Sequence, residues 1–277
     1  MGAPDPRLDE SGSIDFRINR MLKAYSKSDP PPNRVKPVPI PVIRRIMAVA
    51  TASLDPLNMG IADMICIAFF FLLRPGEYAI STSESTPFEF KDVQLFQGHL
   101  RLPLDTATQA QIMSCTFASL TFDKQKNAVR GEVVGHAPSG ALDLCPARAI
   151  SRRILHLREH NAPPNTPLSH VYTNNGIQPI KPADITSSLR LAVTYLGPAL
   201  GFLPQDVSAR CLRAAGANAL LCGGVDTDVI RLLGRWRSDE MLRYLHTQAG
   251  PVLRDFSKKM LAGGSFTLIP NQQVPTF

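Results

Sequence analysis

The sequence is poor in the features that mark several large protein classes. It has one tryptophan and five cysteines, and no two cysteines stand at C-x-x-C spacing. This usage argues against a disulfide framework and against a zinc cluster, and it indicates a reducing, intracellular setting. Neither G-x-x-x-x-G-K-S/T nor G-x-G-x-x-G occurs, so nothing predicts nucleotide binding, and we expect no cofactor.

Long apolar runs are also missing. The most apolar segment, Met64 to Leu73, is about half as long as the roughly 20 residues that span a membrane, and Asp63 precedes it. We therefore expect a buried helix there and no membrane association. The opening residues MGAPDPRLDE show neither an apolar signal core nor an Arg-rich transit pattern, so no export is expected.

Positive charge is in excess. The 277 residues carry 30 Lys and Arg against 23 Asp and Glu, a formal net charge of +7 with a pI near 9.3. A hydrophobic content of 44% with 19% charged residues is typical of a globular chain, long enough for one large domain or for one domain and part of a second. The basic balance favours a polyanionic partner.

Prolines and hydrophobic periodicity divide the chain. Apolar residues at helical spacing predict an amphipathic helix over residues 14–27, at the end of a segment 1–28. A Pro-rich linker is expected at 29–41, because proline lacks a backbone donor and favours extended geometry. The main domain should cover 42–262, followed by a C-terminal tail at 263–277.

The main domain alternates between helical and β-rich patterns. Two helical patterns between residues 42 and 73 are separated by SLDPLNMG, whereas HLRLPL, ASLTF and GEVVGH within 88–136 are short β-rich pieces between polar turns. Helical patterns return in LCPARAISRRILHLREH and KPADITSSLRLAVTYLG. We predict a mainly α fold with a small three-stranded antiparallel β insert.

The last third of the chain has clear helix boundaries. Ser208 is placed to cap a helix that stops at Gly223, and Asp226 to cap the helix TDVIRLL. A further helix after Gly234 carries Tyr244.

Tyr244 stands among basic residues. The stretch LGRWRSDEMLRYLH surrounds it with Arg235, Arg237, Arg243 and His246. A negatively charged substrate would explain these neighbours, and their positive potential would favour the phenolate over the neutral phenol, whose pKa is ordinarily about 10. The alternative is a core tyrosine on an amphipathic helix.

Three further arginines suggest anion binding. Arg210 and Arg213 would share a helix face, where a phosphate could accept two parallel hydrogen bonds from each guanidinium. Arg74 follows a run of apolar residues, and Glu77 could orient it. The alternatives are a solvated basic face for the first pair and, for Arg74 with Glu77, simple neutralisation of a helix end.

Four motifs together resemble a known family. FFLLRPGEY, the basic hairpin DKQKNAVRGE, ARCLRAAGANALLCGGVD and IRLLGRWRSDEMLRYLH come in the order and at the approximate spacing of the tyrosine recombinases, or phage integrases. The resemblance covers about residues 35–260, is carried mainly by the last two motifs, and is to members of eukaryotic mobile-element type. It implies the tyrosine-recombinase catalytic fold and, for 1–28, a remnant helix of an N-terminal DNA-clamping domain.

The resemblance implies a role for each motif residue. Tyr244 would attack a DNA phosphodiester, leaving a 3′-phosphotyrosine link and a free 5′-hydroxyl, without ATP. Arg74 and Arg213 would neutralise the non-bridging phosphate oxygens, so that no metal is needed. Lys126, or in reserve Lys124, would protonate the leaving 5′-oxygen from a hairpin turn. Both lysines are otherwise ordinary turn residues.

Two positions depart from the pattern of the family. Arg210 stands where the motif H-x-x-R has histidine, and Arg235 stands nine residues before Tyr244, where the family usually has His or Trp. Arginine can hold a phosphate oxygen but cannot accept a proton near neutral pH. Either a one-residue shift brings Trp236 into that place, or Arg235 itself makes the contact.

The leading prediction is therefore a site-specific recombinase or integrase that cleaves and rejoins double-stranded DNA. We expect it to act as a tetramer on DNA, in the nucleus if the source is eukaryotic and otherwise in the cytoplasm or nucleoid. Further DNA contacts are expected from Lys124, Arg130 and Arg237. A catalytically impaired, recombinase-derived DNA-binding protein is the alternative, and a type IB topoisomerase is a weaker one.

Two other segments leave alternatives open. PVLRDFSKKMLAGG, at 251–264, could dock on a neighbouring subunit, as C-terminal segments of the family do, or fold back on its own domain. His156 and His160, four residues apart in HLREH, resemble half of a metal site but lack a third ligand and the H-E-x-x-H order.

Overall fold

The computed structural model divides the chain into two compact units, Met1–Arg34 and Val35–Phe277. It describes residues 5, 7, 11–25, 36–80, 85–123, 131–236 and 255–266. Within the smaller unit, α1 (Phe16–Tyr25) lies in the range predicted as an amphipathic helix, and none of its residues is buried. In the stretches just given, no helix is both long and apolar enough to cross a membrane.

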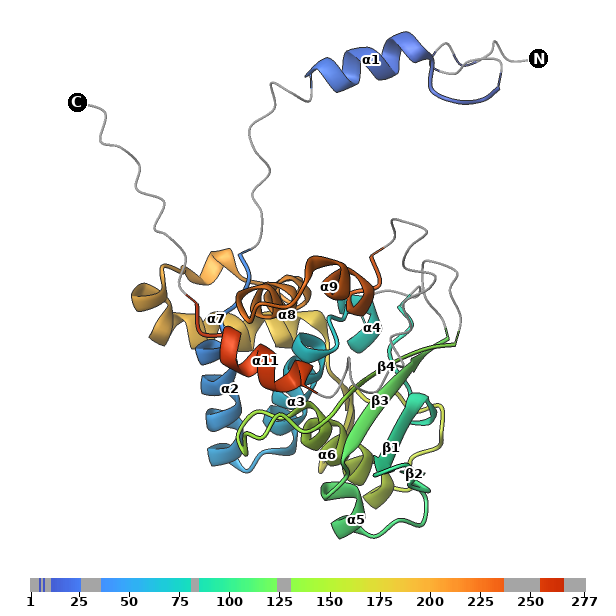
Figure 1. The fold of residues 1–277 in the computed structure, drawn as a ribbon, viewed down its shortest axis with the longest axis vertical. Helices are drawn as coiled ribbons and strands as arrows, with labels where there is room; N and C mark the ends of the chain where they lie inside the picture. The colour runs from blue at the N-terminus through green and yellow to red at the C-terminus, as the bar shows by residue number, and fades with distance from the viewer. Residues whose placement is uncertain are drawn as a thin grey trace. The chain divides into compact units, whose positions relative to one another are not determined.

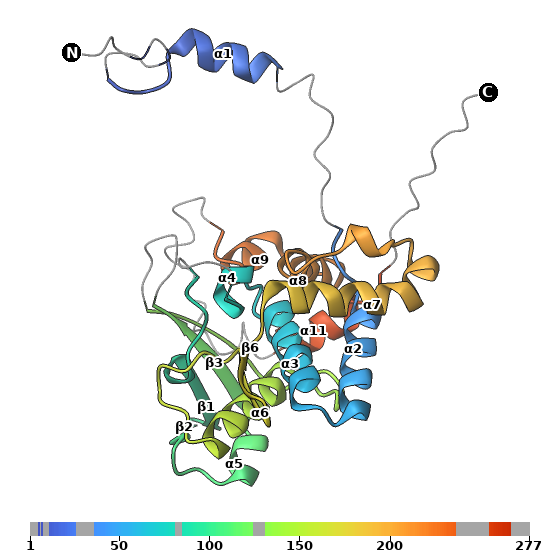
Figure 2. The same ribbon diagram turned by 180° about the vertical axis from the view of Figure 1, so that it is seen from behind.

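The larger unit is mixed and mostly helical, as Figures 1 and 2 show. In the described ranges its α-helices are α2 (Ile40–Ser53), α3 (Pro56–Phe70), α4 (Pro75–Tyr78), α5 (Gln109–Met113), α6 (Pro146–Glu159), α7 (Pro182–Leu200), α8 (Cys211–Cys222), α9 (Thr227–Leu233) and α11 (Phe256–Gly263). Two 3-10 turns, η1 (Phe90–Asp92) and η2 (Pro204–Asp206), lie between them.

α3 is the central helix of this unit. Its residues from Gly60 to Phe70 are all buried, and α2, α6, α7 and α8 pack around it. Asp55 caps its start by accepting from the N–H groups of Leu57 and Asn58. The predicted buried helix is thus confirmed, and it leads into a turn where Leu72 has a φ of 52°.

α2 begins at Ile40, inside the segment predicted as linker. Pro39 is its N-cap and Pro41 is its second residue, and proline is tolerated there because the first helical turn has no partner for its N–H groups. Pro39 and Pro41 therefore stand at the start of a helix.

The main sheet has four antiparallel strands in the order β2-β1-β3-β4, one more than predicted. They are β1 (Val93–Gln97), β2 (Leu100–Arg101), β3 (Phe117–Phe122) and β4 (Glu132–His136). The prediction lacks β1, although its buried Val93 and Leu95 alternate with less buried residues, which is a period-two signal. HLRLPL contributes only the two residues of β2, because Leu100 and Arg101 pair with the end of β1 and the chain then leaves the sheet.

A second, two-stranded sheet has no counterpart in the sequence predictions. β5 (His170–Thr173) and β6 (Gly176–Pro179) pair in antiparallel fashion, with Thr173 opposite Gly176. The two-residue loop Asn174–Asn175 and the φ of 100° at Gly176 form a tight hairpin. The dipeptide Asn-Gly in TNNG is a typical hairpin-turn signal, but the flanking strands are too short to show a clear β pattern in the sequence.

His136 ties the main sheet to α3. Its Nε2 lies 2.9 Å from the Phe70 carbonyl oxygen, which can only accept, so Nε2 carries the proton of a neutral ring. The rings of Phe70 and Phe71 pack edge-on against it. Its Nδ1 is buried and has no hydrogen-bond partner in the described part of the chain. Burial lowers the pKa of His136 to about 4.

The C-terminal helices follow the predicted order, with one correction. α8 is the helix expected after Ser208, but Arg210 is its N-cap, and the Ser208 N–H donates to Cys211 Sγ at 3.1 Å. The hydroxyl of Ser208 accepts from the Arg210 N–H at 3.4 Å, one residue before the first helical residue, so it does not cap the helix as predicted. Asp226 does cap α9, by accepting from the Asp228 N–H.

α11 folds back on its own domain. Phe256 and Met260 are buried, and the helix packs along α8. Ser257 Oγ donates to Ala137 O at 2.7 Å, and the Ile40 N–H donates to Gly264 O at 2.8 Å. Of the two alternatives for this segment, the structure has the fold-back arrangement.

The neutral, buried His136 predicts a pH-dependent contribution to stability. Its folded pKa of about 4 lies below the unfolded value of 6.5, so its contribution is full above pH 6.5 and is lost as pH falls toward 4. The difference in unfolding free energy between wild type and His136→Gln, measured by urea denaturation, should shrink by about 3 kcal/mol over that range. A difference that does not change with pH would contradict this assignment.

Candidate functional site

Arg74 stands where α3 gives way to α4. Residues 71–73 are buried, whereas Arg74 is the N-cap of α4 and its side chain is 32% exposed. Glu77 accepts from the Arg74 N–H at 2.8 Å and from Arg74 Nη1 at 3.1 Å. The pairing expected from the sequence is present, and it fixes the guanidinium at the protein surface.

Arg213 reaches the same place from α8. Its Nη2 donates to the carbonyl oxygen of Gly234, the C-cap of α9, and its guanidinium carbon lies 4.5 Å from the centroid of the Trp236 ring. Nη1 is buried and has no hydrogen-bond partner among the residues that the structure describes. Burial first, and then the charges of Arg235 and Arg74, lower the pKa of Arg213. An anion at this point would offset both the cost of burying the Arg213 charge and its repulsion from the other two guanidinium groups.

Arg235 is the buried member of the group. Its side chain is 2% exposed, and its φ of 57° is one that residues other than glycine rarely adopt. Nη1 donates to Phe71 O at 3.1 Å and to Leu233 O at 3.2 Å. Nη2 donates to Leu72 O at 3.1 Å and to Glu77 Oε2 at 3.2 Å. Both terminal nitrogens are thus directed at protein acceptors.

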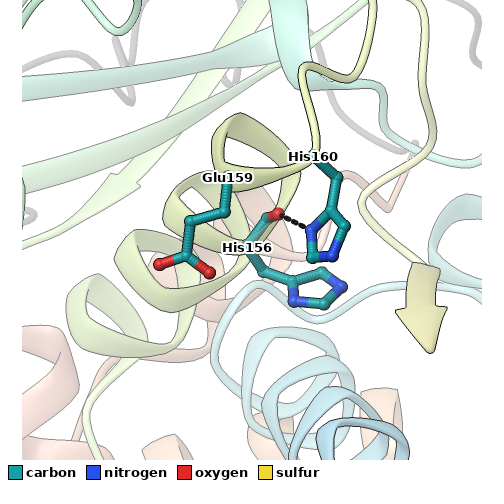
Figure 3. A group of neighbouring side chains, drawn as sticks. All are labelled: His156, Glu159 and His160. Atoms are coloured by element: carbon teal, nitrogen blue, oxygen red, sulfur yellow. Dashed lines mark hydrogen bonds between the residues drawn. The ribbon is translucent and has the colours of Figure 1, made fainter. Parts of the chain in front are cut away.

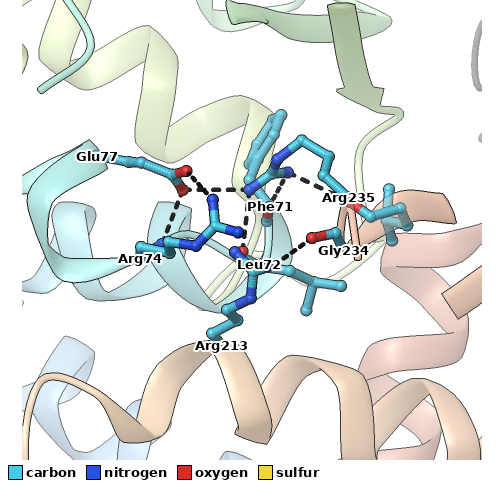
Figure 4. A network of polar contacts seen from close by, with 8 residues as sticks. Phe71, Leu72, Arg74, Glu77, Arg213, Gly234 and Arg235 are labelled. Carbon is cyan, nitrogen blue, oxygen red and sulfur yellow. Dashed lines mark hydrogen bonds and ion pairs between the residues drawn. The ribbon is translucent and has the colours of Figure 1, made fainter. Parts of the chain in front are cut away.

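Acceptors around both terminal nitrogens make the burial of this cation possible. The carbonyls at the C-terminal ends of α3 and α9 carry partial negative charge, and Glu77 adds a full one. The face of the guanidinium lies 3.9 Å from the centroid of the Phe122 ring. Figure 4 shows Glu77 joined by dashed lines to both Arg74 and Arg235, with the Arg213 guanidinium directed toward that of Arg74.

The two positions that depart from the recombinase pattern have different surroundings. Arg210 is exposed at the N-cap of α8 and does not join Arg213 in this group. The terminal nitrogens of Arg235 face main-chain carbonyls and Glu77, whereas Trp236 packs against Arg213. Of the two residues, Trp236 is thus the one that packs against Arg213, and the choice between them for the recombinase-like role stays a prediction.

The structure brings together Arg74, Glu77, Arg213, Arg235 and Trp236. Other predicted site residues lie outside the described ranges and stay predictions. They are Lys124, Lys126, Arg130, Arg237, Arg243, Tyr244 and His246.

Two neighbours of the group were not singled out from the sequence. The hydroxyl of the buried Tyr78 donates to Ala209 O at 2.8 Å and so ties α4 to the segment before α8. Gly216 lets α8 approach the end of α3, because a Cβ there would overlap the Phe69 carbonyl oxygen. This approach brings Arg213 next to Arg74. A lone glycine inside a helical pattern was the available signal.

His156, Glu159 and His160 lie close enough together to be considered as metal ligands (Figure 3). However, the Tyr172 N–H donates to His156 Nε2 at 2.9 Å, so the ring uses its only lone pair on the edge of β5. Burial, and then the charges of Arg153 and His160, lower the pKa of His156 to about 4, which also keeps the ring neutral. His156 therefore acts as a hydrogen-bond acceptor for β5.

The close approach at Gly216 predicts a large cost for one added methyl group. Gly216→Ala should lower the free energy of unfolding by about 2 to 3 kcal/mol, because the methyl group meets a backbone oxygen and Leu72 Cδ2. Gly76→Ala is the matched control, since its nearest neighbour would be Ser85 Oγ at 3.8 Å. It should stay within about 0.5 kcal/mol of wild type in the same urea titration. Equal effects of the two substitutions would show that α8 and α3 are not in close contact.

Comparison with known proteins adds no relative to this description. A scan against protein-family models finds no match, and searches of curated proteins and of solved structures find none either.

Proposed function

We propose that the chain is a DNA strand-cleaving and rejoining enzyme of the tyrosine recombinase type, which acts on double-stranded DNA as a tetramer. One observation carries the proposal. The buried Nη1 of Arg213 has no hydrogen-bond partner among the described residues, and the Arg74 side chain points toward the Arg213 guanidinium. A phosphodiester oxygen would supply the missing negative charge, and guanidinium groups match its geometry.

The proposed reaction is a phosphoryl transfer. The phenolate oxygen of Tyr244 attacks the phosphorus, the bond to the 5′-oxygen breaks, and Lys126 or Lys124 gives its proton to that oxygen. Arg74 and Arg213 stabilise the charge that builds on the non-bridging oxygens. Rejoining reverses the same steps on another strand, so no external energy source is consumed.

The charge of the whole chain supports DNA as the substrate. A formal net charge of +7 attracts a duplex through its phosphates before any base is read. Arg210 is exposed close to α8 and is available for such a contact.

A second candidate is a recombinase-derived protein that binds DNA without cutting it. It is favoured by Arg210 and Arg235, since neither can accept the phenol proton and Arg235 is buried among carbonyls. In this case Arg74 and Arg213 would hold a backbone phosphate without reaction.

Covalent trapping distinguishes the two candidates. Duplexes that the protein binds are selected from a randomised pool, nicked near the bound site as suicide substrates, and incubated with it. We expect a protein–DNA adduct on a denaturing gel with wild type and none with Tyr244→Phe. Arg74→Ala and Arg213→Ala should slow adduct formation by about 100- to 1,000-fold, because each removes a donor to the charged transition state.

Arg44→Ala is the control, because Arg44 is an exposed arginine paired with Asp143 and makes no contact with the group. An adduct that persists in Tyr244→Phe would exclude Tyr244 as the nucleophile. Salt-sensitive binding without any adduct would favour the non-cleaving candidate, and relaxation of unrelated supercoiled plasmid would favour a type IB topoisomerase.

A further inference from the structure

We propose that Arg235 is a positioning residue. It holds Arg74 toward Arg213 through Glu77 and through the backbone turn 71–73, and it does so without touching the bound anion. The inference rests on the anion-binding role proposed for Arg74 and Arg213, but not on strand cleavage.

The first path runs through the Glu77 carboxylate. Oε1 accepts from Arg74 Nη1 at 3.1 Å, whereas Oε2 accepts from the Arg74 N–H at 2.8 Å and from Arg235 Nη2 at 3.2 Å. A carboxylate held at both oxygens cannot rotate without breaking one of these bonds. Arg235 therefore adds a third hydrogen bond, made from the protein interior, to the carboxylate that orients Arg74.

The second path runs through the main chain. The two terminal nitrogens of Arg235 donate to Phe71 O and Leu72 O, each at 3.1 Å. Leu72 has a φ of 52°, a conformation that costs free energy for a leucine and persists only when its surroundings impose it. Arg74 follows two residues later, so the bonds of Arg235 also set the direction in which its side chain leaves the backbone.

Burial assigns Arg235 this indirect role. Its side chain is 2% exposed against 32% for Arg74, and each terminal nitrogen makes two hydrogen bonds inside the protein. An anion that reached this guanidinium would have to displace main-chain carbonyls.

The single tryptophan of the chain offers a readout at the site. Trp236 lies 4.5 Å from the Arg213 guanidinium, so its fluorescence should respond when an anion binds there. Inorganic sulfate is titrated at constant ionic strength against chloride. Arg235→Met should weaken sulfate binding by about tenfold, as should Arg74→Ala, and the double variant should bind no more weakly than Arg74→Ala alone.

Arg235→Lys separates positioning from simple charge. The lysine keeps the positive charge, but one ammonium cannot reach both Glu77 and the two carbonyls, so we expect binding between that of wild type and that of Arg235→Met. Wild-type binding in Arg235→Lys, together with additive losses in the double variant, would overturn the inference, because Arg235 would then act only through its positive charge.

Glu77→Gln carries the test if Arg235→Met does not fold. It should weaken sulfate binding and be non-additive with Arg74→Ala, and wild-type affinity in Glu77→Gln would overturn the inference.

Arg153→Met is the matched control for lost stability. Arg153 is 2% exposed and donates to the carbonyls of Leu168 and His170, away from the arginine group. It should lower the unfolding temperature and leave sulfate affinity unchanged. An unchanged affinity in Arg74→Ala itself would count against the anion site and hence the proposed function, whereas loss in Arg74→Ala with wild-type affinity in Arg235→Met would count against the positioning role alone.

Discussion

The carboxylate of Glu77 is the constraint on which the arginine group depends. It pairs with Arg74 at the surface through both oxygens and with Arg235 in the interior through Oε2. Removing one partner of a buried ion pair typically costs about 3 to 5 kcal/mol, because the other charge is left without compensation. The site and the local fold are therefore not separable, since the residue that would orient an anion-binding arginine also keeps a second arginine buried.

Local signals predict a large part of this arrangement. The apolar run of α3, the cap at Asp226 and the Arg74–Glu77 pair all follow from spacing over a few residues, and all are present. The burial of Arg235 could not be predicted in this way, because its acceptors Phe71 O and Leu72 O lie more than 160 positions earlier in the chain. From the sequence alone, an arginine that directly follows the glycine at a helix end is expected to be exposed, because the acceptors that allow its burial lie far away in the chain.

The sheet and the histidines show the same limit. The strands of the β5–β6 hairpin have four residues each, so the hairpin is defined by a tight turn rather than by a long pattern, whereas β1 carries a period-two pattern that the prediction missed. His156 and His160 share the spacing of metal ligands, yet the lone pair of His156 is taken by Tyr172. Residue spacing alone does not show which groups hydrogen-bond to the histidine nitrogens, and those bonds decide whether a nitrogen is available to bind a metal.

The packing of α11 against its own domain has a consequence for how copies of the chain could assemble. The helix is held by buried side chains against α8 and by the bond between Ile40 N and Gly264 O, and these contacts are the same whether the helix belongs to one chain or to its neighbour. A tethered helix competes at an effective concentration on the order of millimolar, so exchange between copies requires a scaffold that raises local protein density to that range. A DNA duplex carrying adjacent binding sites would be such a scaffold. Exchange of α11 between copies would then be a property of the protein–DNA complex and not of the free protein.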